Sequence, residues 1–205
     1  MKSSVIIIDY GMGNIRSILN KIHRAGHTAL VSYDKELIKN AAKLILPGVG
    51  HFSSGMNRLE ERNIIEILND KVLNDKTPIL GICLGMQLFS CFSEEGSVKG
   101  LGWIDANTIR FTLNDIRHKV PHMGWNSIEQ KKESPLLKDI PDNRHFYFVH
   151  SYHVKCHKDE DILTTSTYGY EFVSAIQKEN IFGTQFHPEK SHEWGEKMLN
   201  NFLNL

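Results

Sequence analysis

One cysteine in this chain has the neighbours of a catalytic nucleophile. Cys83 lies in the segment GICLG (residues 81–85), after the apolar run 78–82 and before a second apolar stretch. Glycine two residues before and two after a nucleophile, at a turn from strand to helix, is typical of a nucleophile elbow. Such a turn places the thiol at the amino end of a helix, whose free N–H groups favour the thiolate. It also aims the N–H of Leu84 at a tetrahedral oxyanion. The pattern predicts covalent catalysis by Cys83.

A histidine near the carboxyl terminus is the best candidate for the base that this thiol needs. His187 follows the strand-like run 181–186 and precedes Pro188 and Glu189. Residues i and i+2 of an extended chain point the same way, roughly 6.6 Å apart, so Glu189 can lie beside the imidazole. A carboxylate there selects the imidazole tautomer and stabilises the imidazolium. We predict a triad of Cys83, His187 and Glu189.

Four other histidines lack the spacing of a metal site. His150 and His153 are three residues apart on an expected strand, so their side chains should face opposite ways. His118 and His122 lie beside Pro121 in an expected loop, without a Cys or carboxylate set at ligand spacing. We expect surface or hydrogen-bonded core histidines, and neither a metal ion nor a cofactor.

Length and composition exclude several classes of protein. The 205 residues include 24 Lys and Arg against 24 Asp and Glu, so no net positive field attracts nucleic acid or anionic lipid. No apolar run approaches the roughly 18–20 residues of a membrane span, and the first residues do not resemble a signal peptide. Cys91 and Cys156 lack C-x-x-C spacing and a neighbouring base, which indicates free structural thiols. We expect a single cytoplasmic domain, residues 1–205, that binds neither nucleic acid nor membrane.

The first half of the chain alternates short apolar runs with amphipathic stretches. Helical spacing of apolar residues occurs over 15–22 and over about 55–74. This alternation predicts an α/β fold with a mostly parallel central sheet and helices on both faces. The runs that predict its buried strands are 5–8, 29–31, 43–46 and 78–82.

After about residue 100 the pattern changes to strands with few helices. A closing helix carries Trp194 and Phe202. Because no linker or repeat intervenes, we interpret this region as a strand-rich second half of the same domain. The expected strands are 108–111, 146–154, 162–166, 173–176 and 181–186.

Two glycine-containing turns follow predicted strands. The segment GMG (11–13) is not a dinucleotide-binding fingerprint, because Arg16 stands where the third glycine would be. We expect a tight turn that displays Asn14 at the carboxyl edge of the sheet. The segment PGVG (47–50) leaves backbone N–H groups free to point outward, which suits a second oxyanion donor.

Six motifs together resemble the triad-type class I glutamine amidotransferases, and among these the glutaminase subunits of imidazole glycerol phosphate synthases. The resemblance spans nearly the whole chain and implies the single-domain, flavodoxin-like fold of that family. The motifs are DYGMGN (9–14), LPGVG (46–50), GICLGMQ (81–87), PHMGWN (121–126), FVHSY (148–152) and QFHPEKS (185–191).

The resemblance implies a reaction and a set of glutamine contacts. Cys83 would form a γ-glutamyl thioester with glutamine, while His187 transfers protons and Glu189 orients the imidazole. The oxyanion hole would be formed by the N–H of Leu84 and the peptide between Val49 and Gly50. The positions implied to hold the substrate L-glutamine are Gly50, Gln87, Ser151 and Tyr152.

The resemblance also implies a partner. A cyclase subunit with a (β/α)8 barrel would form a heterodimer with this chain and use its ammonia in histidine biosynthesis. The products would be imidazole glycerol phosphate and aminoimidazole carboxamide ribotide. The positions implied to face the partner or the ammonia passage are Asn14, Met123, Trp125, Asn126, Tyr147 and Lys190.

One position departs from the pattern of the histidine-pathway members. His192 stands where these members often carry Gln, which leaves the ammonia acceptor open. The alternative is a paralogous glutaminase that supplies ammonia for amidation of a surface-polysaccharide sugar. A third interpretation, an idle regulatory subunit, is opposed by the intact set Cys83, His187 and Glu189.

Overall fold

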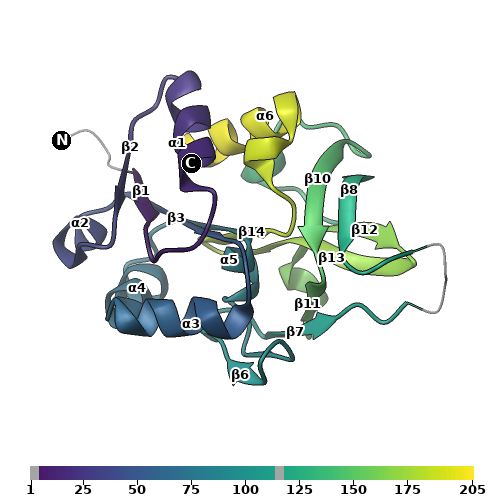
Figure 1. Cartoon of the computed structure of the whole chain (residues 1–205). Coiled ribbons are helices and arrows are strands. Elements are labelled where there is room, and N and C mark those ends of the chain that lie inside the picture. The colour runs from purple at the N-terminus through teal and green to yellow at the C-terminus, as the bar shows by residue number, and fades with distance from the viewer. Residues whose placement is uncertain (1–4, 114–117) are drawn as a thin grey trace.

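An eight-stranded sheet forms the centre of the computed structural model, which describes residues 5–113 and 118–205 (Figure 1). Four of its seven strand pairings are parallel, which confirms the predicted mostly parallel α/β fold. The parallel strands, in spatial order, are β2 (Ala29–Ser32), β1 (Val5–Ile8), β3 (Lys43–Gly48), β4 (Ile79–Cys83) and β14 (Ile181–Thr184). The antiparallel strands β13 (Tyr170–Lys178), β12 (Ile162–Tyr168) and β9 (Glu129–Gln130) follow.

Helices cover both faces of the sheet, as its apolar strands require. Along β1, Ile6 and Ile8 belong to one core cluster, whereas Val5 and Ile7 belong to the other. In the described part of the chain, no helix is long and apolar enough to cross a membrane. One face carries α1 (Ile15–Arg24) and α6 (His192–Leu203), and the other carries α3 (Phe52–Glu61) and α4 (Ile65–Asn69) (Figure 1). The short helices α2 (Lys35–Lys39) and α5 (Leu84–Gln87) follow β2 and β4.

The prediction of one continuous helix over about 55–74 is wrong, because the chain breaks the helix at Asn63. Asn63 takes a left-handed backbone, φ 53°, which asparagine tolerates better than most residues. The N–H of Asn63 bonds the carbonyl of Glu60 at 2.7 Å, and the N–H of Ile64 bonds that of Leu59 at 3.3 Å. This pattern of bonds ends a helix. The chain therefore forms α3, then α4, then a π-helical turn η1 (Asp70–Asn74).

The strand predicted over 146–154 is also divided, at Ser151. Its carbonyl accepts the N–H of Phe111 at 3.0 Å where the chain passes from one small sheet to another. His150 and His153 therefore lie on different strands, not on one strand as predicted. The first sheet is a ribbon of β8 (His122–Ser127) and β10 (His145–His150). The second contains β11 (Tyr152–Cys156), β7 (Ala106–Arg110), β5 (Phe92–Ser93) and β6 (Val98–Lys99).

Strand β8 corrects the expected loop over 121–126. Its six residues pair antiparallel with β10 from end to end, with Gly124 opposite Phe148. Alternate side chains are buried and exposed, but Gly124 breaks the hydrophobic alternation that would have predicted a strand. In Figure 1 the ribbon stands between α6 and the antiparallel end of the large sheet.

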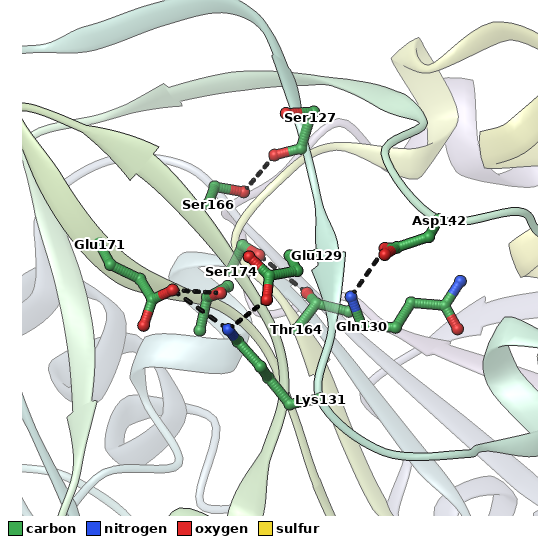
Figure 2. A network of polar contacts seen from close by, with 10 residues as sticks. Ser127, Glu129, Gln130, Lys131, Asp142, Thr164, Ser166, Glu171 and Ser174 are labelled. Atoms are coloured by element: carbon green, nitrogen blue, oxygen red, sulfur yellow. Dashed lines mark hydrogen bonds and ion pairs between the residues drawn. The ribbon is translucent and has the colours of Figure 1, made fainter.

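Polar side chains close that antiparallel end (Figure 2). The ammonium of Lys131 bridges Glu129 at 2.7 Å and Glu171 at 3.1 Å, across the outer strands. Beneath it, the fully buried hydroxyls of Thr164 and Ser174 bond each other at 2.8 Å. Each of these two buried hydroxyls therefore has a hydrogen-bond partner within the sheet end.

The backbones of β3 and α5 approach each other without a side chain between them. A Cβ added to Gly85 would lie 1.9 Å from the carbonyl oxygen of Leu46. One added to Gly48 would lie 2.7 Å from the N–H nitrogen of Gly85. The hydroxyl of Tyr10 donates to the carbonyl of Pro47 at 2.7 Å and anchors the same strand end. This contact sets the position of the helix that begins directly after Cys83.

We expect Gly85→Ala to lower the free energy of unfolding by about 1–3 kcal/mol or more, because the new methyl group meets backbone that cannot rotate away. Gly55→Ala in α3 is the matched control, since its added Cβ would meet only flexible ends of Leu88 and Leu84, at 3.1 Å or more. Alanine also raises helix propensity there by about 1 kcal/mol. Urea unfolding of both variants measures the difference, and equal midpoints would contradict the packing argument.

Candidate active site

Cys83 occupies a strained turn between β4 and α5. Its backbone has φ 55° and ψ −111°, a left-handed conformation that is rare for a residue with a side chain. Gly81 leaves the necessary space, because a Cβ there would lie 2.6 Å from the ring of Phe89. The side chain of Cys83 is buried, with 6% of the residue exposed. The strand–turn–helix context predicted from GICLG is therefore present.

His187 and Glu189 form a buried pair beside this turn. Nδ1 of His187 lies 3.0 Å from Oε1 of Glu189, and both side chains are only 1% accessible. Glu189 lies in the 3-10 turn η4 (Pro188–Lys190), which brings its carboxylate back toward the preceding imidazole. The backbone N–H of His187 donates to the carbonyl of Tyr147 at 2.9 Å, so β10 holds the histidine from the other side.

The charge state of His187 depends on its two neighbours. Burial alone lowers its pKa, but interactions with Cys83 and Glu189 raise the pKa well above 6.5. The net effect favours the imidazolium. Within the described residues, Nε2 of His187 is buried without a hydrogen-bond partner of its own. A protonated ring with one bonded and one available N–H suits a group that delivers a proton to a reacting atom.

A cavity of about 310 Å³ connects the thiol with the predicted glutamine contacts. That volume lies at the lower end of the range for small-molecule sites. A larger cavity of about 440 Å³ lies among β7, β11 and β13, but it contains none of the triad residues. The residues that line the smaller cavity are Val49, Gly50, Cys83, Leu84, Gln87, Glu95, Pro121, Val149, His150, Ser151, Tyr152 and His187.

The predicted oxyanion donors both line this cavity, at the ends of the paired strands β3 and β4. Leu84 is the first residue of α5, and the segment of Val49 and Gly50 lies between β3 and α3. Val49 is 42% exposed, and Gly50 has φ 113°, a conformation that glycine adopts without strain.

Two polar residues at the site were not predicted from the sequence. Nε2 of Gln185 donates to Sγ of Cys83 at 3.6 Å, and its Oε1 accepts from Nε2 of Gln87 at 2.9 Å. Glu95 gives the cavity a carboxylate, which suits an ammonium group of a ligand. Gln185 stands two residues before His187, and residues at i and i+2 of an extended chain point the same way, so this spacing was the available signal.

The predicted partner-facing residues do not all lie together. Met123 and Trp125 are 66% and 46% exposed on one face of the ribbon, where Trp125 stacks on His192 at 4.8 Å with an interplanar angle of 9°. On that face, Tyr147 pairs with Trp125, and the ammonium of Lys190 lies 5.5 Å from the Tyr147 ring.

Two of these predicted residues lie elsewhere. Asn126 points to the opposite face of the ribbon and donates to the carbonyl of Thr167 at 2.9 Å. Asn14 precedes α1 as its N-cap residue. The exposed aromatic face is therefore built by Met123, Trp125, Tyr147, Lys190 and His192.

The remaining thiols and histidines lack the features of a reactive site. Burial raises the pKa of Cys156 to about 12, and Cys91 is an exposed free thiol. His122, His150 and His153 are buried and hydrogen-bonded. Across residues 5–113 and 118–205, no three His, Cys, Asp or Glu side chains are grouped so that they could hold a metal ion.

Comparisons with known proteins agree with this geometry. The family model described as glutamine amidotransferase class-I matches residues 6–205. "Imidazole glycerol phosphate synthase subunit HisH 2" of Methanococcus maripaludis is 53% identical, over 97% of this chain and 98% of the relative. The protein of the same name from Pseudomonas aeruginosa is 46% identical, over 98% and 99%. The solved structure of PurLQS from Thermotoga maritima shares the fold with a TM-score of 0.75 at 19% identity, over 100% and 99% of the two chains. With an elbow cysteine, a buried His–Glu pair and a match along nearly its whole length, the chain belongs to the class I glutamine amidotransferases.

Proposed function

We propose that this chain is a glutaminase subunit that hydrolyses L-glutamine and passes the ammonia to a cyclase subunit of imidazole glycerol phosphate synthase. One observation carries the proposal: the strained Cys83 shares a cavity with His187, whose ring is bonded to the buried Glu189. Two relatives at 53% and 46% identity carry the name of that synthase's subunit, and this supports the choice of pathway.

The reaction begins with attack of Sγ of Cys83 on the carboxamide carbon of glutamine. The proton of the thiol resides on His187, and the oxyanion accepts hydrogen bonds from Leu84 and from the Val49–Gly50 peptide. Collapse of the tetrahedral intermediate breaks the C–N bond, while His187 gives its proton to the departing nitrogen as ammonia forms. Water, deprotonated by His187, then attacks the γ-glutamyl thioester, so glutamate leaves and the thiol is restored.

The polar lining of the cavity suits the α-ammonium group of an amino-acid substrate. Glu95 supplies a carboxylate for the α-ammonium group, while Ser151 and Tyr152 line the adjoining wall. Gln87 also lines the cavity, and its Nε2 donates to the carbonyl of Tyr152 at 2.9 Å. The exposed aromatic face around Trp125 begins next to the cavity, because Val149 lines the cavity and pairs with Met123 in the ribbon. We infer that the barrel-shaped cyclase binds this face in a heterodimer, and that the complex works in the cytoplasm, where a free thiol stays reduced.

A second candidate acceptor is a surface-polysaccharide sugar. His192 forms part of the exposed aromatic face through its stack on Trp125, so a departure at this position changes the surface offered to a partner. The triad is the same in both candidates, and only the partner differs. Glutamine consumption in the complex with the histidine-pathway cyclase and its ribonucleotide separates the two candidates, because this mixture contains no sugar acceptor.

Cys83→Ser should abolish glutamine-dependent product formation by the complex with the histidine-pathway cyclase but retain turnover with added ammonium salt. The acceptor site lies on the partner, so free ammonia bypasses the missing thiol. Cys91→Ser is the matched control and should keep both activities. Loss of both activities in Cys83→Ser would contradict a separate acceptor site. A wild-type chain that consumes no glutamine above background in this complex would favour the sugar acceptor.

Glu189→Gln should lower the pKa of His187, because the substitution removes the buried negative charge that helps to raise it. The glutaminase kcat should fall by about 100-fold or more, as expected when the group that orients a catalytic histidine is neutralised. Titration of ring ¹⁵N resonances in histidine-labelled protein measures the pKa. Glu193→Gln, an exposed position of α6, provides the same substitution as a control. An unchanged His187 titration in Glu189→Gln would contradict the assigned pair.

Trp125→Ala should weaken binding to the cyclase by tenfold or more, since an aromatic residue near the centre of an interface contributes about 2 kcal/mol or more. Folding should be little affected, because the ring is 46% exposed. Tyr33→Ala is the matched control: its ring is 45% exposed, next to the edge strand β2, away from the ribbon. Titration calorimetry with the cyclase measures both variants, and an unchanged Kd for Trp125→Ala would remove this role.

A further inference from the structure

Two buried histidines form a hydrogen-bonded pair behind the active-site cavity. Nδ1 of His122 lies 2.9 Å from Nε2 of His150, across the two strands of the ribbon. His122 is 3% exposed and His150 is 6% exposed, and His150 also lines the cavity. Neither residue has a place in the mechanism above, so the pair calls for a physical explanation.

The donor and the acceptor of each hydrogen bond in this pair can be assigned from the groups on either side of it, the carbonyl of Tyr152 and the amide of Asn126. Nδ1 of His150 lies 2.8 Å from the carbonyl oxygen of Tyr152, which can only accept, so Nδ1 carries the proton. Nε2 of a neutral His150 must then accept, which makes Nδ1 of His122 the donor. Nε2 of His122 is left as an acceptor, and the amide Nδ2 of Asn126 lies 3.4 Å from it. The donors therefore run one way, from Asn126 to the carbonyl of Tyr152.

The surroundings keep both rings neutral and in place. Burial, together with the charge of His118, lowers the pKa of His122 to about 4. Burial first, and then the charge of His122, lowers the pKa of His150 well below 6.5. The ring of His122 is stacked between Phe148 at 4.9 Å and Tyr168 at 4.1 Å, both with an interplanar angle of 29°.

A second set of hydrogen bonds connects the carbonyl of Tyr152 with the nucleophile. The carbonyl of Tyr152 accepts a second hydrogen bond from Nε2 of Gln87 at 2.9 Å. That nitrogen also donates to Oε1 of Gln185 at 2.9 Å, so two acceptors fix the orientation of the Gln87 amide. With its oxygen engaged, Gln185 presents Nε2 to Sγ of Cys83 at 3.6 Å. An N–H directed at sulfur stabilises the thiolate over the thiol.

We propose that His122 and His150 are positioning residues for Cys83. Asn126, His122 and His150 form a relay, a row of hydrogen bonds that all donate toward the carbonyl of Tyr152 and hold it in place. This carbonyl in turn fixes the orientation of the amides of Gln87 and Gln185. The relay thereby maintains an N–H donor on the nucleophilic sulfur. The consequence for turnover rests on the proposed glutaminase function, whereas the consequence for thiol reactivity does not.

The first test measures the reactivity of Cys83 in the full chain. The probe is 6-diazo-5-oxo-L-norleucine, a glutamine-like electrophile, and mass spectrometry of the peptide that contains Cys83 follows its alkylation. His122→Leu should lower the maximal alkylation rate by about tenfold, as for the loss of one net hydrogen bond. His122→Asn should restore most of the rate, because its amide nitrogen can replace Nδ1 as the donor to His150.

His153→Leu is the matched control. His153 is 4% exposed and, like His122, packs against Phe111 and Phe172, but it bonds the hydroxyl of Tyr170 at 2.8 Å and lies outside the relay. The two Leu variants should lose similar stability in urea unfolding, whereas only His122→Leu should slow alkylation. Equal alkylation rates in the two variants, or no rescue by His122→Asn, would overturn the proposal.

The second test reads the tautomers directly. In histidine-labelled wild-type protein at neutral pH, the ¹⁵N resonances of His122 and His150 should show the proton on Nδ1 and none on Nε2. A proton on Nε2 of either ring, or a charged ring, would overturn the relay. If glutamine turnover is absent while the tautomers and alkylation rates are as expected, the proposed function fails and the relay stands.

Discussion

The close approach of β3 and α5 is the constraint on which the active site depends. The carbonyl of Leu46 and the backbone of Gly85 leave no room for a Cβ between them. The helix can therefore begin directly after Cys83, and the chain must reverse its direction at that residue, with φ 55°. A backbone conformation of this kind costs of order 1–3 kcal/mol and persists only where the surrounding packing enforces it. Here the enforcing contacts are backbone to backbone.

The reacting groups come from distant parts of the chain and meet at the carboxyl edge of the parallel sheet. Cys83 ends β4, and His187 follows β14, its direct neighbour in the sheet. Parallel pairing brings these two ends together, as in other open α/β folds. Burial alone would leave His187 neutral, but the carboxylate of Glu189 and the sulfur of Cys83 offset the cost of its charge. The site therefore combines a low-dielectric environment with a compensated positive charge.

Local patterns in the sequence predicted the central sheet and the grouping of Cys83, His187 and Glu189, because both depend on short-range signals. GICLG contains its own turn geometry, and the i, i+2 spacing predicted the contact of His187 with Glu189, although this contact forms through the 3-10 turn Pro188–Lys190 and not through the expected extended backbone. The break at Asn63 was missed because hydrophobic spacing continues through a residue whose effect lies in its φ angle. The ribbon strand β8 was missed because its partner β10 lies about twenty residues away in the sequence.

Gln185 was missed for a related reason. Its spacing from His187 could have placed it at the site, but its bonds to Cys83 and Gln87 have no pattern in sequence, since these partners lie about a hundred residues away. The imidazole pair behind the cavity is a similar case. His122 and His150 face each other only because the ribbon aligns them, and sequence spacing suggested a loop and a single long strand. Cross-strand register of this kind follows from tertiary structure.

The ribbon has one consequence for how such a protein can change over evolutionary time. Its outward positions, Met123 and Trp125, alternate with the inward positions His122, Gly124 and Asn126. Because neighbouring residues of a strand point to opposite sides, single substitutions can remodel the surface proposed to bind the partner while the inward residues proposed to support catalysis are retained. The two-residue period of one strand thus separates selection on partner binding from selection on catalysis. The product of a duplicated gene could acquire a new binding partner without first losing its catalytic activity.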